Sequence, residues 1–373
     1  MLSRKLRTRL LALMLGAAGT LLAAEVALRF LPVATPMRPL PVHAGQPVFR
    51  FAPGRAYTFS QDWNFHLANR GWINAAGFVN DQEYVTESPL PLLAVVGDSF
   101  IEAAMVPYAE TLQGRLAADV AGRGRVYSFA ASGAPLSQYL VWAEYAREHF
   151  APEALVITVV GNDFDESMAR YSLYPGLHHF TPGADGGLEL VRVDFTPSRL
   201  GPLVYASALG RYVLLNLRAR ALLGRLFAGG TELDDTWFVG NTPGSYTPER
   251  LAAAQQAVDA FLERLPAASG LPPERVLLLV DGMRPELYDP PQLERAETSF
   301  FGVMRRTLLE RARAQGFEAL DLQPAMLERH AREGLCFEFP TDYHWNGAGH
   351  GAVADVARGS RLWRDFLERL EPQ

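Results

Sequence analysis

Short apolar runs alternate with longer amphipathic segments through most of the chain after residue 90. Polar residues rarely break these runs, a pattern typical of strands that are buried on both faces of a sheet. The runs lie at residues 92–96, 125–129, 154–160, 275–280 and 317–321. In the segments between them apolar residues recur every three or four positions, which predicts helices with one buried face. The predicted helices cover residues 111–121, 136–149, 248–265, 294–314 and 347–370.

This alternation predicts an α/β fold with a doubly wound, parallel, five-stranded sheet between two layers of helices, as in flavodoxin. Residues 165–245 fit the alternation poorly, because they are rich in turns and include an apolar, arginine-studded stretch at 203–227. We interpret residues 165–245 as an insertion that caps the ligand site, which in such a sheet lies at the carboxyl ends of the strands. We expect the stretch at 203–227 to pack against the core rather than lie on a membrane surface, because apolar helix faces usually point into the domain.

A further apolar run, at residues 10–24, follows a basic cluster between positions 4 and 9 near the N-terminus. Glu25 and Arg29 interrupt the apolar sequence beyond it. A membrane-spanning helix needs about 20 residues. The run reaches that length when it is counted through Leu31, with the two charged residues at the outer interface.

Three interpretations of this N-terminal segment compete. It is an uncleaved signal-anchor, a signal peptide cleaved after Leu22-Ala23-Ala24, or an amphipathic helix on a membrane surface. We favour the anchor because the cleavage site is poor. Basic residues retain the N-terminal end of such a helix in the cytoplasm. The prediction is therefore a single-pass protein of the inner membrane with its α/β domain in the periplasm.

The chain then divides into three predicted parts. Residues 1–31 form the basic segment and transmembrane anchor. Residues 32–88 form a spacer and N-terminal extension, because prolines are frequent up to residue 50 and aromatic residues and turns follow. Residues 89–370 form the α/β domain, with the insertion at about 165–245.

Composition excludes several classes of function. The formal net charge of −6 over 373 residues gives no general attraction to nucleic acid. The single cysteine, Cys336, forms no disulfide within the chain and excludes a cysteine-rich zinc site. The adjacent pair His178-His179 is not expected to bind a metal, because neighbouring residues rarely chelate one ion together and no further pattern of metal ligands lies near them in the sequence. We therefore expect no metal and no cofactor.

Polar landmarks follow three of the predicted strands, and one more precedes the last helix. Each alone is a common turn or helix cap, and a lone histidine is more often structural than catalytic. Together they matter, because ligands of a doubly wound sheet bind at the carboxyl ends of its strands. The landmarks are Gly97-Asp98-Ser99-Phe100, Ser132-Gly133, Gly161-Asn162-Asp163 and Asp342-Tyr343-His344-Trp345-Asn346.

These residue types suit acyl transfer. A serine hydroxyl becomes a good nucleophile only when a base takes its proton, and histidine is the base suited to neutral pH. A carboxylate holds the imidazole in the correct tautomer. Backbone amides near Ser99 and Gly133 and the side-chain amide of Asn162 are candidate donors to the oxyanion of the tetrahedral intermediate.

The four landmarks resemble the sequence blocks of the SGNH, or GDSL-type, hydrolase superfamily, over about residues 90–358. The resemblance implies that Ser99 is the nucleophile and an oxyanion-hole donor, together with Gly133 and Asn162. It also implies that His344 is the base and that Asp342 orients it.

The sequence departs from the usual blocks of this superfamily at two places. The aspartate usually lies three residues before the histidine, where this chain has Thr341, and the second block lacks its usual asparagine. The Asp-x-His-Trp-Asn form is similar to a membrane-anchored bacterial branch that contains exopolysaccharide O-acetyltransferases and related esterase-like proteins.

The predicted function is therefore that of a serine esterase that acts on an O-acylated carbohydrate or a small ester. An O-acetyltransferase that modifies an exported polysaccharide is an alternative, because both reactions pass through the same acyl-enzyme. A catalytically inactive SGNH fold that serves as a binding or assembly module is another alternative.

Overall fold

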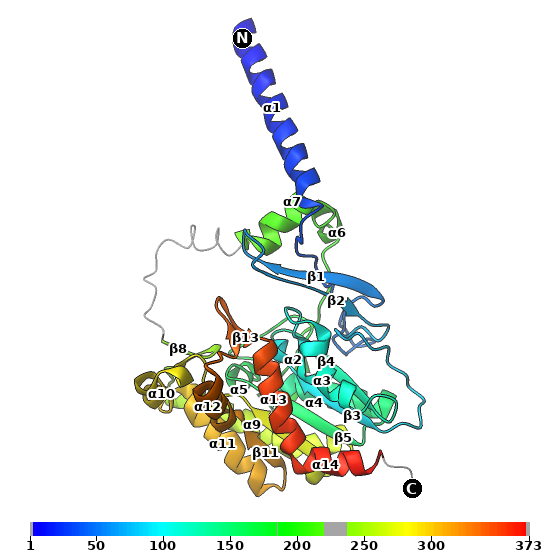
Figure 1. Ribbon diagram of the computed structural model, residues 1–373, viewed down its shortest axis with the longest axis vertical. Helices are drawn as coiled ribbons and strands as arrows, with labels where there is room; N and C mark the ends of the chain where they lie inside the picture. Colours follow the sequence, from blue (N-terminus) through cyan, green and yellow to red (C-terminus); the bar gives the residue numbers. More distant parts are fainter. Residues whose placement is uncertain (1–2, 185, 220–236, 371–373) are drawn as a thin grey trace.

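The centre of the molecule is a five-stranded parallel sheet, seen in a computed structural model that describes residues 3–184, 186–219 and 237–370 (Figure 1). The strands lie in the order β11-β10-β5-β3-β4. Their bounds are β3 Leu92–Gly97, β4 Arg125–Ala130, β5 Ala154–Val159, β10 Val276–Val280 and β11 Glu318–Asp321. Each strand agrees within a few residues with a predicted apolar run, so the predicted α/β fold is confirmed.

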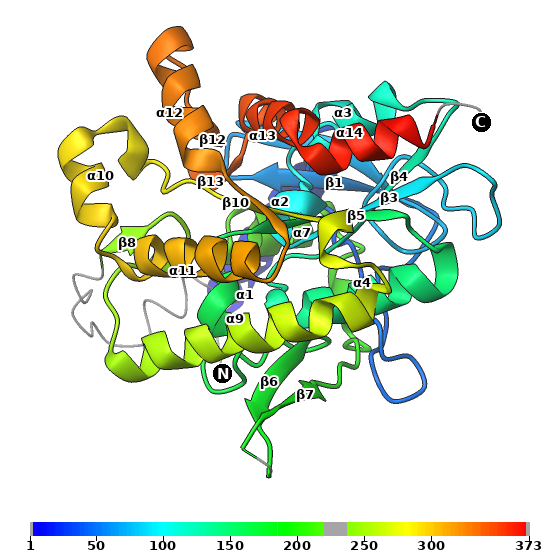
Figure 2. The ribbon, with the colours of Figure 1, turned by 90° about the horizontal axis from the view of Figure 1, so that it is seen from below.

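Alternate residues of β3 belong to different hydrophobic clusters, which is why the run is apolar throughout. Leu92, Ala94 and Val96 pack with α4 (Leu136–Phe150), α9 (Pro248–Ser269) and α11 (Phe300–Ala314). Leu93 and Val95 pack on the other face of the sheet with a second set of helices. These are α3 Leu112–Asp119, α12 Leu322–Glu333, α13 Gly347–Gly359 and α14 Arg361–Glu368. Figure 2, seen from below the view of Figure 1, shows these two layers of helices on opposite sides of the sheet.

Two predicted helices are each divided by a serine. Ser299 and Ser360 both have extended backbones, and their hydroxyls accept hydrogen bonds from the backbone amides three residues later. Each serine therefore caps a new helix, and the continuous apolar periodicity concealed both breaks. The stretch at 294–314 becomes α10 (Pro290–Ala296) and α11, and the stretch at 347–370 becomes α13 and α14.

A long helix, α1 (Arg4–Leu28), projects from the domain and has no buried residue. It is long and apolar enough to cross a membrane. Below it lies an antiparallel hairpin of β1 (Arg55–Gln61) and β2 (Leu67–Ile73), which separates α1 from the central sheet (Figure 1). The proline-rich segment before the hairpin packs on the domain, because Phe49 and Phe51 belong to the larger core cluster.

Residues 165–219 contain a hairpin and then short helices at the base of α1 (Figure 1). The expectation that residues 203–227 pack against the core is wrong for the described part. Between residues 204 and 219 only Ala208 and Asn216 are buried, and α7 contacts α1. Residues 220–227 lie outside the described part of the chain. The elements are β6 His178–Pro182, β7 Leu188–Arg192, α6 Gly201–Val204, α7 Ala208–Arg211 and a π-helical turn Tyr212–Asn216.

Apart from three 3₁₀ turns, at Tyr108–Glu110, Pro273–Arg275 and Glu286–Tyr288, the remaining elements are short helices and strands. They are α2 Ser99–Glu102, α5 Asp163–Glu166, β8 Phe238–Val239, β9 Thr242–Pro243, β12 Glu338–Phe339 and β13 Asp342–Trp345.

Candidate active site

The sheet brings the predicted site residues to one edge. Ser99, Gly133 and Asn162 follow β3, β4 and β5, which are neighbours in the sheet. His344 comes from β13, and the centre of its ring lies 4.8 Å from that of Phe100, the residue after Ser99. Residues far apart in the sequence therefore meet at the edge where a doubly wound sheet binds its ligands.

The turn after β3 explains why Gly97, Asp98 and Ser99 occur together. A Cβ on Gly97 would lie 2.4 Å from Thr158 Oγ1, so only glycine fits beside β5. Asp98, not Ser99, caps α2, because its Oδ1 accepts from the backbone amide of Phe100 at 2.9 Å. Ser99 is half-buried, and its hydroxyl donates to Asp98 Oδ2 at 3.2 Å. No hydrogen bond links Ser99 and His344, both of which are described.

Asp342 is the carboxylate that His344 contacts. In a strand, residues two apart face the same side, so β13 aligns the two side chains. Nδ1 of His344 donates to Asp342 Oδ1, and the backbone amide of His344 donates to the same oxygen at 3.0 Å. Burial opposes ionisation of Asp342, but these bonds and the charge of His344 hold its pKa below the ordinary value. This pairing directs Nε2 of His344 away from Asp342.

Thr341 stands where the usual aspartate of the family would be. Its Oγ1 lies 2.8 Å from Nε2 of His66, which follows the turn of the β1–β2 hairpin. The unusual spacing in the last block therefore leaves His344 with a carboxylate partner and gives position 341 a different contact.

Gly133 and Asn162 lie on either side of the Ser99 turn. Gly133 has a φ of +78°, and a Cβ there would lie 3.2 Å from the ring of Tyr174. The Asn162 amide is held at both ends: Oδ1 accepts from Asn241, and Nδ2 donates to Glu166 Oε2 at 3.0 Å. Since an amide nitrogen carries two hydrogens, one contact with Glu166 leaves the other hydrogen to donate elsewhere.

Glu102 is a site residue that the sequence reasoning missed. It ends α2, is 3% exposed, and accepts from both the backbone amide (2.8 Å) and the hydroxyl (3.0 Å) of Ser132. Glu102 thereby ties the loop that carries Gly133 to the helix that begins with Ser99. A glutamate one helical turn after Ser99 was the available signal, because that spacing places it under the same turn.

Glu102 predicts a dependence of stability on pH. Burial raises its pKa from 4.5 to about 7, although the bonds from Ser132 oppose this. The folded protein therefore holds the proton more tightly than the unfolded chain, and this contribution is full below about pH 4.5 and lost as the pH rises through about 7. Glu102→Gln should flatten the fall in melting temperature across that window. The exposed Glu87→Gln is the matched control, and an equal slope in both variants would contradict the prediction.

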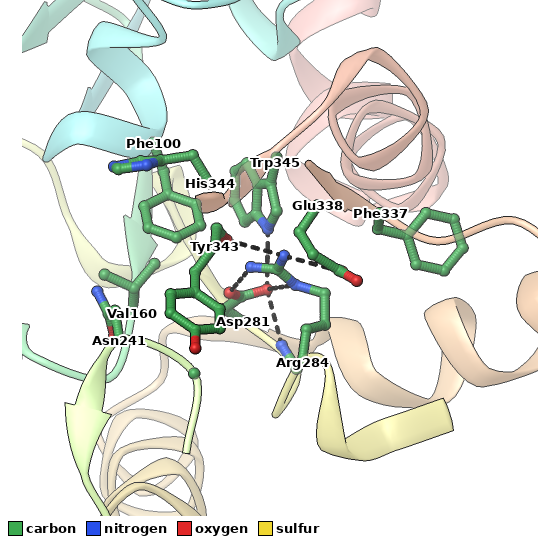
Figure 3. A network of polar contacts seen from close by, with 12 residues as sticks. Phe100, Val160, Asn241, Asp281, Arg284, Phe337, Glu338, Tyr343, His344 and Trp345 are labelled. Atoms are coloured by element: carbon green, nitrogen blue, oxygen red, sulfur yellow. Dashed lines mark hydrogen bonds and ion pairs between the residues drawn. The ribbon is translucent and has the colours of Figure 1, made fainter. Parts of the chain in front are cut away.

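A buried polar network that was not predicted holds β13 in place (Figure 3). Asp281 follows β10 and accepts from Arg284 Nη2 at 2.5 Å and from Trp345 Nε1 at 2.9 Å. Arg284 also donates to the carbonyl oxygen of Tyr343 at 3.1 Å. The network therefore holds Tyr343 and Trp345, the residues on either side of His344. Asp281 follows a predicted strand, so the rule that found Ser99 could have found it too.

A cavity of about 350 Å³ lies beside the Ser132–Gly133 loop. Most of its walls are apolar and come from the segment before β1 and from the region after α5. Glu102 and Ser132 also line it. The lining residues are Met37, Pro39, Phe49, Phe51, Glu102, Ala131, Ser132, Tyr174, Pro175 and Phe195. Among the described residues no group of three or more His, Cys, Asp or Glu side chains is placed to hold a metal ion.

The fold is similar to those of several lipases and esterases. A lipase from a goat rumen metagenome has a TM-score of 0.39 and 15% identity, with 75% of this chain and 100% of that chain covered. A member of the lipolytic protein G-D-S-L family from Veillonella parvula has a TM-score of 0.36 and 9% identity, with 72% and 97% covered. The esterase EstA from Pseudoalteromonas has a TM-score of 0.35 and 12% identity, with 74% and 98% covered.

A scan of the sequence against models of protein families and a search of curated proteins found no match. The similarities to solved structures concern the fold, and at such low identities they assign no substrate and no residue role to this chain.

Proposed function

We propose that this protein is a membrane-anchored serine esterase of the SGNH type. The observation that carries the proposal is the His344–Asp342 pair, whose imidazole ring lies against that of Phe100, the residue after Ser99, at the carboxyl edge of the sheet. The fold alone does not make an enzyme, because function depends on the site that a fold holds. Here Ser99, His344 and Asp342 would supply the hydroxyl, the imidazole and the carboxylate that acyl transfer requires.

The reaction follows from these roles. His344 Nε2 takes the proton of Ser99 as Oγ attacks the acyl carbonyl carbon, and the carbonyl oxygen becomes an oxyanion. The tetrahedral intermediate then collapses, the alcohol leaves with the proton from His344, and the acyl group stays on Ser99. A water molecule gives its proton to His344 and attacks the acyl-enzyme. Collapse of this second intermediate releases the carboxylic acid, and Ser99 regains the proton.

The oxyanion would be met by the backbone amides of Ser99 and Gly133 and by the second amide hydrogen of Asn162. Asn241 and Glu166 hold the Asn162 side chain, so its donor is fixed before the reaction begins. Donors that are already oriented stabilise developing charge without a reorganisation cost.

Asn162→Ala should lower kcat by about 10²–10³, the usual effect of losing one oxyanion donor, with the fold intact. Steady-state kinetics on a chromogenic ester, with circular dichroism as the check on folding, measures this. Asn346→Ala is the matched control, because Asn346 caps α13 by accepting from the amide of Gly349 at 2.9 Å. That variant should lose stability and keep its chemistry. An unchanged kcat in Asn162→Ala would remove Asn162 from the site.

The substrate that we propose carries an O-acyl group, on a carbohydrate or on a small alcohol. The apolar cavity beside the Ser132–Gly133 loop suits an acyl group or another apolar part of the substrate. An O-acetyltransferase would use the same serine and differ only in the acceptor, a sugar hydroxyl in place of water. The purified protein given an acetyl donor with and without a glycan acceptor separates the two activities, because only a transferase yields an acetylated glycan.

We propose that α1 anchors this enzyme in the inner membrane, with residues from about 40 onward in the periplasm. The support is the basic cluster before an apolar helix that is long enough to span. Protease added to intact spheroplasts that express the full chain should therefore digest the domain, as immunoblotting would show. A cytoplasmic protein of the same cells should stay intact. Full protection of the domain until detergent is added would contradict this topology.

A further inference from the structure

Exposed apolar side chains gather around the end of α1 that meets the domain. Phe30 is 85% exposed, Trp63 71% and Leu200 68%, and Val204, Val213 and Leu217 are also exposed. We call these six residues the platform. We propose that the platform rests on the outer surface of the membrane that α1 spans, so that a surface contact as well as a spanning helix fixes the enzyme there. This inference rests on the proposed anchor.

Glu25 joins α1 to the start of α7, next to the platform residues of 204–217. Its carboxylate accepts from the Ser207 hydroxyl at 2.7 Å and from the backbone amides of Ala208 and Leu209 at 3.1 and 2.9 Å. These groups form the N-terminal end of α7, so a side chain of the anchor caps a helix of the domain. Glu25, the charge that interrupts the apolar run of α1, therefore attaches α1 to α7.

Further contacts fix the platform against the β1–β2 hairpin. Asn216 Oδ1 accepts from the backbone amide of Ala34 at 3.0 Å, and its Nδ2 donates to Ser60 Oγ at 2.8 Å. The hydroxyl of Tyr212 donates to the carbonyl oxygen of Trp63 at 2.9 Å. Residues 207–216 are held by Glu25 at one end and by the hairpin and Ala34 at the other. The direction of α1 therefore determines the direction in which the platform faces.

The length of α1 places the platform at the level of the outer interface. An α-helix rises about 1.5 Å per residue, so Glu25 lies roughly 24 Å along the axis from Arg9. The hydrocarbon core is about 30 Å thick, and an arginine side chain at its edge reaches the headgroups. With the Cα of Arg9 about 6 Å inside the inner boundary and its guanidinium reaching the headgroups, Glu25 lies at the outer boundary. Figure 1 shows α6 and α7 beside this end of α1.

The chemistry of the surface suits a bilayer with acidic headgroups. Arg199, Arg211 and Arg218 occur between residues 199 and 219, and no aspartate or glutamate does, although the whole chain has a net charge of −6. Tryptophan, such as Trp63, is favoured at membrane interfaces, and arginines attract anionic lipids. Continuity with α1 makes the bilayer the natural occupant of this face.

The contact would also orient the active site. α2 and β13 lie on the side of the catalytic layer that faces the β1–β2 hairpin and α1 (Figure 1). Arg218, beside the platform residue Leu217, contributes to holding the pKa of Asp342 down. A platform on the bilayer would therefore turn the carboxyl edge of the sheet towards the membrane.

The single cysteine makes the test direct. In a Cys336→Ser background, a fluorophore is attached to Leu200→Cys or Val213→Cys in the full chain, reconstituted in phosphatidylcholine vesicles with phosphatidylglycerol. Met14→Cys in α1 is the reference inside the bilayer. Val85→Cys, beside Arg125 at the amino end of β4, is the exposed reference away from it. Brominated lipid should quench the labels at 200 and 213 by about twofold, as at 14, while iodide should quench mainly the label at 85.

The other possible results distinguish a failure of the proposed anchor from a failure of the proposed platform. If brominated lipid does not quench the label at 14, the anchor is wrong and this inference falls with it. If the label at 14 is quenched but those at 200 and 213 respond to iodide like the label at 85, the anchor stands and the platform does not lie on the membrane. If neither quencher reaches 200 and 213, another protein or a second copy covers the face, which also overturns the inference.

Discussion

Ser99→Ala should fold with near-native melting and lose nearly all ester turnover, a fall in kcat of about 10⁴–10⁶. The structure makes the forecast for stability specific, because Asp98 holds the cap of α2 and Ser99 contributes only one 3.2 Å bond to that aspartate. The variant should also lose covalent labelling by a fluorophosphonate, which reacts with an activated serine. Peptide mapping of the labelled wild-type protein should find the label on Ser99.

The matched control is a serine that does cap a helix. Ser360 Oγ accepts from the backbone amide of Trp363 at 3.0 Å at the start of α14. Ser360→Ala should melt lower by the equivalent of about 1 kcal/mol and keep its turnover and labelling. Turnover that survives in Ser99→Ala would refute the esterase proposal. A wild-type protein that never labels would favour the inactive binding module instead.

The fold was predictable from the sequence because buried parallel strands are continuous apolar runs that helices separate. The same logic located Ser99, Gly133 and Asn162, because all three follow such runs. It failed for the helix breaks at Ser299 and Ser360, where one capping side chain ends a periodicity that the apolar residues continue. Local hydrogen bonds of this kind leave no trace in the hydrophobic pattern.

The residues that support the site were less predictable, for different reasons. Asn241, which fixes the Asn162 amide, lies near the end of the predicted insertion and meets its partner only through the tertiary fold. Glu25 was expected only as an interfacial charge after the apolar run, and its contact with the start of α7 was not predictable from the sequence. A buried or membrane-level charge needs partners, and when they lie far along the chain the sequence shows only the charge.

Asp342→Asn is the second large effect, and it tests the unusual spacing of the last block. The asparagine keeps the shape of the aspartate but loses the charge that stabilises the imidazolium and selects the tautomer of His344, so kcat should fall by about 10⁴. Protonation of the imidazole also becomes harder without the carboxylate. The acidic limb of the kcat/KM profile should therefore move to lower pH, while KM changes little.

Thr341→Val is the control for the family's usual aspartate position, and it should leave both kcat and the acidic limb nearly unchanged, because Thr341 contacts His66 and not His344. Asp98 is the rival carboxylate, since it is buried at the site: burial raises its pKa to about 6, although the bond from the Phe100 amide and the charge of His344 oppose the rise. If Asp342→Asn is silent and Asp98→Asn shifts the limb, Asp98 orients the base and the contact in β13 is structural. A loss in Asp342→Asn with an unmoved limb would mean that the substitution disturbs β13 rather than the charge beside His344.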